Sequence, residues 1–233
     1  MKKLVVLMVF ASLSLSVCAQ TDGNYEYSKE FIWGINKNTN GGLIGGFIMR
    51  WSSARGEKKF RSIGFEAMNV KNPRETRISN GQSQFIYGKS HYLYAIRAQY
   101  GFDHLLFKKA PHQGVQINFN YSIGPTLGVI APYYLESTDG NSYPFSYQKF
   151  PTWNTVARTG YLFEGLSESS LTFGINARAG LKFEMGAFKS NVTGFEIGAL
   201  VEGFTQKIEL MPNEKDQALF LSAYLTIFYG RRK

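Results

Sequence analysis

The residues of this chain best suited to acid–base or nucleophilic chemistry are its three histidines. His91 follows Ser90, and a serine beside a general base is the combination used in hydrolysis and acyl transfer. Neighbouring residues on a β-strand point to opposite faces, so these two side chains form a poor catalytic pair. His104 and His112 lie in one predicted turn, and the histidines lack the spacing of metal ligands. The sequence therefore predicts no catalytic residue, no metal site and no cofactor.

Charged residues at alternate positions are the second group that could do chemistry. In segment 171–186, Arg178, Lys182 and Glu184 share one face, and the opposite face is wholly apolar. An unpaired buried charge costs several kcal/mol, so this segment does not fit a core that covers both faces. One face requires water or polar partners and the other requires apolar surroundings. A transmembrane strand of a closed barrel meets both requirements.

The same alternation recurs along the chain and predicts the elements that position these charges. Eight strands are expected, at 29–36, 43–51, 63–67, 92–103, 115–129, 171–186, 195–202 and 219–229. Pro125 falls within the fifth strand, where it would cost a ladder hydrogen bond unless a bulge absorbs the loss. The predicted fold is all-β, an eight-stranded antiparallel up-and-down transmembrane β-barrel.

The barrel places one set of charged side chains in its interior. These residues are Glu30, Arg50, Glu66, Arg97, Arg178, Lys182, Glu184, Glu196 and Glu202. Eight strands enclose room only for side chains or one small ligand. Because the charges have both signs, we expect a salt-bridged plug, with a narrow gated pore as the alternative.

The first residues of the chain indicate export. Residues 1–19 begin with Lys2 and Lys3, continue with an apolar run and end in small residues, as a cleaved signal peptide does. A lipid anchor on Cys18, the only cysteine, is the alternative. Residues 20–233 would then form the barrel domain. The net charge of +9 becomes +7 without the two lysines (9 − 2), and export disfavours nucleic acid as the partner of this basic chain.

The connections alternate between short and long, as in bacterial outer-membrane barrels. Segments 53–59, 104–113 and 187–190 are predicted as periplasmic turns. Segments 37–41, 70–89, 130–169 and 206–217 are predicted as extracellular loops. This topology leaves both termini in the periplasm.

Two of the predicted extracellular loops carry candidate binding residues. Loop 130–169 contains nine aromatic residues that we expect to form a contact surface: Tyr133, Tyr134, Tyr143, Phe145, Tyr147, Phe150, Trp153, Tyr161 and Phe163. Loop 70–89 carries the basic residues Lys71, Arg74 and Arg77. This basic cluster is either a solvated loop or a clamp on the phosphates of lipopolysaccharide.

Several stretches resemble known outer-membrane proteins. Ser222, Ile227 and Tyr229 are similar to the C-terminal recognition signal of such barrels, although Tyr224 stands where glycine is usual. The segments 87–101 (YGKSHYLYAIRAQYG), 120–135 (NYSIGPTLGVIAPYYL) and 160–166 (GYLFEGL) are similar to an uncharacterised Bacteroidota family of eight-stranded outer-membrane barrels. The resemblance implies a fold and an outer-membrane location, and no activity.

These observations favour a non-enzymatic structural or interaction protein of the outer membrane. We expect it to contact outer-membrane lipid or lipopolysaccharide and another envelope protein, as an accessory subunit of an assembly or secretion machine. Two alternatives remain open: an enzyme that modifies lipid A or phospholipid, and a narrow channel for small solutes.

Overall fold

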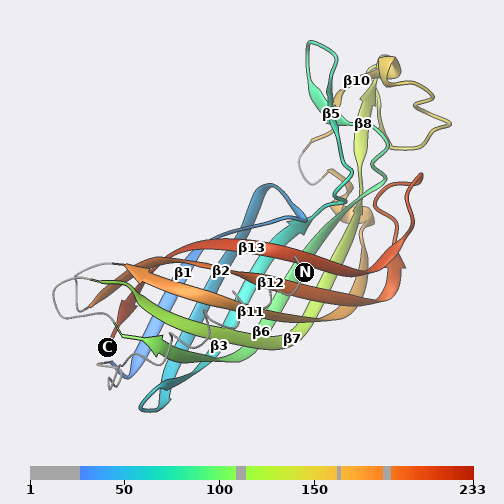
Figure 1. Cartoon of the computed structure of the whole chain (residues 1–233). Helices are drawn as coiled ribbons and strands as arrows, with labels where there is room; N and C mark the ends of the chain where they lie inside the picture. Colours follow the sequence, from blue (N-terminus) through green and yellow to red (C-terminus); the bar gives the residue numbers. More distant parts are fainter. Residues whose placement is uncertain (1–26, 109–113, 162–163, 186–189) are drawn as a thin grey trace, which may run out of the picture.

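Eight long strands form a closed antiparallel barrel in the computed structural model, which describes residues 27–108, 114–161, 164–185 and 190–233 (Figure 1). The strands are β1 (Lys29–Asn38), β2 (Gly41–Gly56), β3 (Lys59–Val70), β6 (His91–Phe107), β7 (Gln116–Pro132), β11 (Ser170–Met185), β12 (Asn191–Ile208) and β13 (Gln217–Arg232). Each strand pairs with the next in the chain, and β1 pairs with β13, where Ile35 lies opposite Ile227. The predicted all-β antiparallel architecture is confirmed. No helix within the described ranges is long and apolar enough to cross a membrane.

The strands extend beyond the limits predicted from the sequence. Segment 53–59 was expected to be a turn, but Ser53 pairs with Arg61 and Lys59 pairs with His104 in continuous ladders. β6 likewise continues to Phe107, and β12 continues to Ile208. The predicted ends are wrong because backbone ladders continue after the alternation of apolar and polar side chains has stopped.

Pro125 lies in β7 without a bulge. The pairing of β6 with β7 keeps one register on both sides of it, from Arg97 opposite Thr126 to Tyr100 opposite Ile123. Asn176, from the neighbouring strand, donates hydrogen bonds to the backbone oxygens of Gly124 (2.9 Å) and Pro125 (3.1 Å). The register shows no bulge at Pro125, and the side-chain amide of Asn176 satisfies two backbone acceptors beside the proline.

A second folded body stands at one end of the barrel (Figure 1). We call it the cap, residues 71–90 and 133–169. It contains the hairpin β4 (Arg77–Ser79) and β5 (Gln84–Ile86), a three-stranded sheet of β8 (Tyr134–Ser137), β9 (Ser142–Pro144) and β10 (Val156–Thr159), and the short 3₁₀ helices η1 (Trp153–Thr155) and η2 (Glu164–Glu168). The described terminal residues lie at the opposite end, where the backbone N–H of Ser28 donates to the oxygen of Lys233 (2.8 Å).

Asn80 explains how the polar segment 70–89 folds. Its side-chain oxygen accepts hydrogen bonds from the backbone N–H groups of Gln82 (3.1 Å) and Ser83 (2.9 Å), which forms the turn between β4 and β5. Its side-chain nitrogen donates to the backbone oxygen of Val156 (2.9 Å), in the other loop. Segment 70–89 connects β3 to β6, as predicted for a loop, but it is ordered, because one asparagine holds both its own turn and the contact with β10.

Two apolar clusters organise the cap end. The cap core comprises Phe85, Tyr133, Leu135, Phe145, Phe150 and Val156. A second cluster, at inward positions of the barrel and on the rim, comprises Val70, Leu93, Ala95, Ile130, Phe204, Ile208, Leu210 and Phe220. The barrel is therefore filled by apolar side chains beneath the cap.

Candidate functional site

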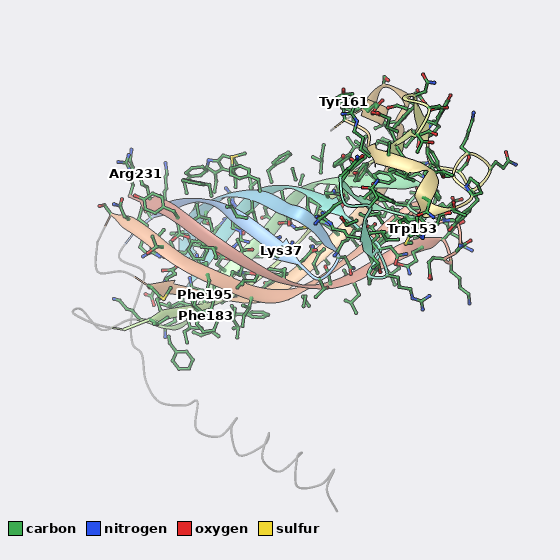
Figure 2. The ribbon with its side chains drawn as sticks, turned by 90° about the horizontal axis from the view of Figure 1, so that it is seen from above. Lys37, Trp153, Tyr161, Phe183, Phe195 and Arg231 are labelled. Carbon is green, nitrogen blue, oxygen red and sulfur yellow. The ribbon has the colours of Figure 1, made fainter. Side chains whose placement is uncertain are left out.

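The outer surface of the barrel is apolar and exposed. Phe173 is 66% exposed, Leu221 70% and Ile227 65%, although all three are large hydrophobic side chains. Aromatic side chains pack against each other on this surface, for example Phe183 and Phe195, whose ring centroids are 4.9 Å apart (Figure 2). A surface of this composition is unfavourable in water and suits a lipid environment.

The inner surface carries all nine charged residues predicted to lie inside, and each is no more than 4% exposed. Six of them form one chain of ion pairs across the barrel, which we call the central network. Arg178 contacts Glu196 (2.5 Å) and Glu66 (3.4 Å), and Arg50 contacts Glu196 (2.8 Å). Arg97 continues the network from Glu66 (3.2 Å) to Glu202 (2.7 Å). Three cations thereby meet three carboxylates, and their charges balance.

Tyr224 completes the central network with an aromatic contact. Its hydroxyl donates to Glu196 (2.7 Å), and the guanidinium of Arg178 lies 4.0 Å from the centre of its ring. A cation over an aromatic face is stabilised when both are removed from water. The inward tyrosine therefore supports both partners of the strongest pair in the network.

The remaining three predicted charges lie nearer the terminal end, in a second network. Lys182 contacts Glu30 (2.7 Å) and Glu184 (3.0 Å), and both carboxylates also bind Arg232. Asp103 lies 3.7 Å from Lys182, and neither of its carboxylate oxygens has a hydrogen-bond partner among the described residues. Together the two networks fill the middle and the terminal end of the barrel with paired charges.

Arg232 and Asp103 were not among the predicted interior charges. A signal for Arg232 was present, because Ser222, Tyr224 and Thr226 all point inward and Arg232 has the same parity. The Gly-Arg-Arg-Lys ending looked like an exposed tail, so the alternation was not continued through it. Asp103 has the parity of Arg97 in β6, and the same extension of the pattern finds it.

The two histidines that the structure describes, His91 and His104, contact a backbone oxygen and a tyrosine ring. His91 Nδ1 lies 3.0 Å from the backbone oxygen of Glu209, and the hydroxyl of Ser90 donates to the same oxygen (3.3 Å). His104 stacks on Tyr121, with ring centroids 5.7 Å apart. His112 lies outside the described residues. Within the described ranges, no group of three histidine, cysteine, aspartate or glutamate side chains could hold a metal ion.

The nine predicted contact aromatics separate into different environments. Tyr133, Phe145 and Phe150 are 7% exposed or less and belong to the cap core, so the prediction that they form a contact surface is wrong. They are covered by loop 70–89: Ile86 N–H donates to the hydroxyl of Tyr133 (3.1 Å), and the hydroxyl of Tyr87 donates to the backbone oxygen of Phe150 (2.8 Å). Burial by a second loop could not be foreseen from the aromatic content of one loop.

The other predicted aromatics lie on or near the cap surface. Tyr134 and Tyr143 are half-buried, whereas Tyr147, Trp153 and Tyr161 are exposed. Figure 2 shows Trp153 and Tyr161 on the cap, apart from each other. Phe163 lies outside the described residues. Trp153 and Tyr161 are therefore separate exposed side chains and not parts of one continuous patch.

The predicted basic cluster is partly neutralised. Arg74 is exposed but contacts Glu214 (2.5 Å), whose hydrogen bond raises the pKa of the guanidinium. Arg77 is exposed and Lys71 half-buried. Nearby, Lys89 is buried against Glu75 (2.8 Å), and this burial lowers the pKa of its ammonium group. The cluster ties the cap to the β12–β13 loop and presents less free positive charge than its sequence indicated.

Comparisons with known proteins give only distant likenesses. No protein-family model matches the sequence, and no match to a curated protein is found. The structure is similar to Ail, the attachment invasion locus protein of Yersinia pestis, crystallised with the heparin analogue sucrose octasulfate: 12% identity, 88% of this chain and 97% of that chain covered, TM-score 0.39. It is also similar to Neisserial surface protein A, with 10% identity, 91% and 100% coverage and a TM-score of 0.38. At scores this low, the resemblance carries no weight for fold or function.

Proposed function

We propose that this protein is a non-enzymatic barrel of the bacterial outer membrane that presents its cap to another envelope protein. The observation that carries the proposal is the folded cap, which has its own apolar core and stands on one end of the closed barrel. Long loops that are merely solvated have no need of such a core. A rigid cap keeps its exposed side chains in fixed positions, as a binding surface requires.

The membrane location is supported by the distribution of polarity across the barrel wall. Buried ion pairs inside and exposed apolar side chains outside reverse the arrangement of a protein dissolved in water. Closure of β1 onto β13 leaves no edge strand whose backbone groups would be unpaired in hydrocarbon. With long loops outside, the cap is extracellular and the termini are periplasmic.

The contact points are the exposed apolar residues of the cap. Tyr161 is 72% exposed, and Trp153 and Leu166 are each 45% exposed. Arg158 lies beside Tyr161, 5.8 Å from its ring, and binds Glu136 (2.5 Å). Aromatic and arginine side chains are the types that contribute most to protein interfaces. A role as an accessory subunit of an assembly or secretion machine fits a cap that binds while the barrel anchors.

Site-specific crosslinking in intact cells tests the proposal. A photoreactive amino acid at Trp153 or Tyr161 should give one crosslinked protein species, because these side chains contact the partner. The matched controls are Gln148, an exposed polar residue of the same cap, and Ile227 on the outer face of the barrel. Neither control should give that species.

A deletion completes this test. Removal of loop 130–169 alone would expose Phe85 and its neighbours. Both 73–87 and 134–168 should therefore be replaced by short turns, and the shortened protein should retain the barrel but no longer bring down the partner protein in a pull-down from native membranes. If no cap position crosslinks and His91→Ala instead changes lipid A composition, the enzyme alternative replaces this proposal.

A further inference from the structure

A cleft of about 400 Å³ opens on the barrel wall at the end opposite the cap. It lies across four neighbouring strands: β13, β1, β2 and β3. The strand register builds its centre, since Phe31 pairs with Arg231 on one side and Trp51 on the other, and Trp51 pairs with Ile63. The cleft therefore follows one row of side chains that continues from strand to strand.

Four basic residues border this row. Lys29, Arg61, Arg231 and Lys233 line the cleft, and none has an ion pair within the described part of the chain. Figure 2 shows Arg231 on the barrel at the end away from the cap. By contrast, the cations of the interior are all engaged by carboxylates. These four charges are available to an anionic group from outside.

The one side-chain carboxylate among the lining residues, that of Glu30, does not neutralise them, and the α-carboxylate of Lys233 balances only one of the four positive charges. Glu30 is 4% exposed, and its oxygens bind Lys182 (2.7 Å) and Arg232 (2.9 Å) inside the barrel. Since successive residues of a strand point to opposite faces, Glu30 points inward while Lys29 and Phe31 point outward. The outer side of the cleft thus keeps an excess of positive charge.

The middle of the cleft is apolar. The rings of Phe31 and Trp51 pack at 5.1 Å, Trp51 is 49% exposed, and Ile63 is 55% exposed. Aromatic side chains of this kind are common where a barrel meets the boundary between hydrocarbon and lipid headgroups. A ligand that fills the cleft must therefore combine negative charge with hydrocarbon.

We propose that the cleft binds an anionic glycerophospholipid of the leaflet at the terminal end of the barrel. Arg61 and Arg231 hold the phosphate, with Lys29 and Lys233 beside it, and an acyl chain lies over Trp51 and Ile63. The inference rests on the proposed membrane location. It differs from the earlier expectation of a phosphate clamp at Lys71, Arg74 and Arg77, which lies at the cap end.

Native mass spectrometry of the folded barrel in detergent, titrated with dioleoylphosphatidylglycerol or dioleoylphosphatidylcholine, tests the proposal. The wild type should prefer phosphatidylglycerol. Arg61→Gln/Arg231→Gln should weaken its binding about 30-fold and leave phosphatidylcholine unaffected. Lys207→Gln/Lys215→Gln removes the same charge from exposed residues at the cap end and should change neither affinity.

Further measurements distinguish a lipid from a free phosphate ester as the ligand. They also distinguish failure of the proposed lipid site from failure of the proposed membrane barrel. Glycerol 3-phosphate alone should bind far more weakly, and Trp51→Ala should weaken both lipids, because the acyl chain contributes. Equal affinities of the wild type for the two lipids, or an equal loss in the cap-end control, would overturn the site while leaving the barrel proposal intact. Heat-modifiable migration in electrophoresis checks folding separately, and its absence in vesicles would overturn the proposed membrane barrel itself.

Discussion

Arg178 occupies a position that few charged residues tolerate, since its guanidinium is fully removed from water. Its cost of burial is offset by Glu196, Glu66 and the ring of Tyr224. The same contacts make it hard to replace. Removal of the cation would leave carboxylates buried with fewer partners than they need.

Arg178→Met should lower the free energy of unfolding by about 3 to 5 kcal/mol, because Glu196 and Glu66 would lose a buried partner. Urea unfolding in detergent micelles measures this change. The matched control is Arg158→Met, which breaks the exposed pair with Glu136 and should have little effect. An equally small effect at Arg178 would show that water reaches the central network.

At the scale of the strands, the alternation of polar and apolar residues gives each strand a polar inner face and an apolar outer face. In β11 and β12, inward Arg178 and Glu196 alternate with outward Ile175 and Ile197, which are 58% and 43% exposed. Because successive side chains of a strand point to opposite faces, each residue faces either the interior or the outside of the barrel. Each strand therefore fixes the polarity of both sides of the wall.

Ile175→Arg and Ile197→Arg should each destabilise the barrel by about 2 to 4 kcal/mol, since the new charge would face hydrocarbon near mid-bilayer. The expected result is loss of the heat-modifiable form in membranes. Thr205→Arg provides the control, because it is an exposed position of β12 at the cap end and should be tolerated. Normal assembly of both isoleucine variants would contradict the lipid-facing assignment.

Alternation alone was enough to predict the strand faces and the strand count, but not the ends of the strands. The alternation of apolar and polar side chains ends before the strands do, because the ladder continues through polar pairs such as Ser53 and Arg61. The cap could not be predicted for another reason. Its contacts join segments that are distant in the sequence, for example Asn80 with Val156 and Phe85 with Tyr133. Such contacts leave no periodic pattern in the local sequence.

At the scale of the molecule, the interior is occupied from end to end. Two ion-pair networks fill the middle and the terminal end, and an apolar cluster around Phe204 and Phe220 fills the cap end. An eight-stranded barrel has little further space. We therefore expect the barrel itself, and not the cap, to block the path through the molecule.

Planar-bilayer recording should accordingly show no steady conductance from the intact protein. The variant with both cap segments replaced should be equally silent, because the networks remain. Steady conductance from the intact protein would establish the channel alternative. Conductance from the shortened variant alone would assign the seal to the cap.

The contact between Arg232 and Glu30 joins the last strand of the barrel to the first, across a sequence separation of 202 residues. Such a contact can form only after the chain between them is ordered, because closing a long loop costs entropy before its contacts are made. A sheet left open at this seam would have two unpaired edges and a carboxylate with only Lys182 beside it. The pairing of β1 with β13 and the contact between Arg232 and Glu30 therefore close the barrel together. We therefore expect the pairing of β1 with β13 to form late in folding.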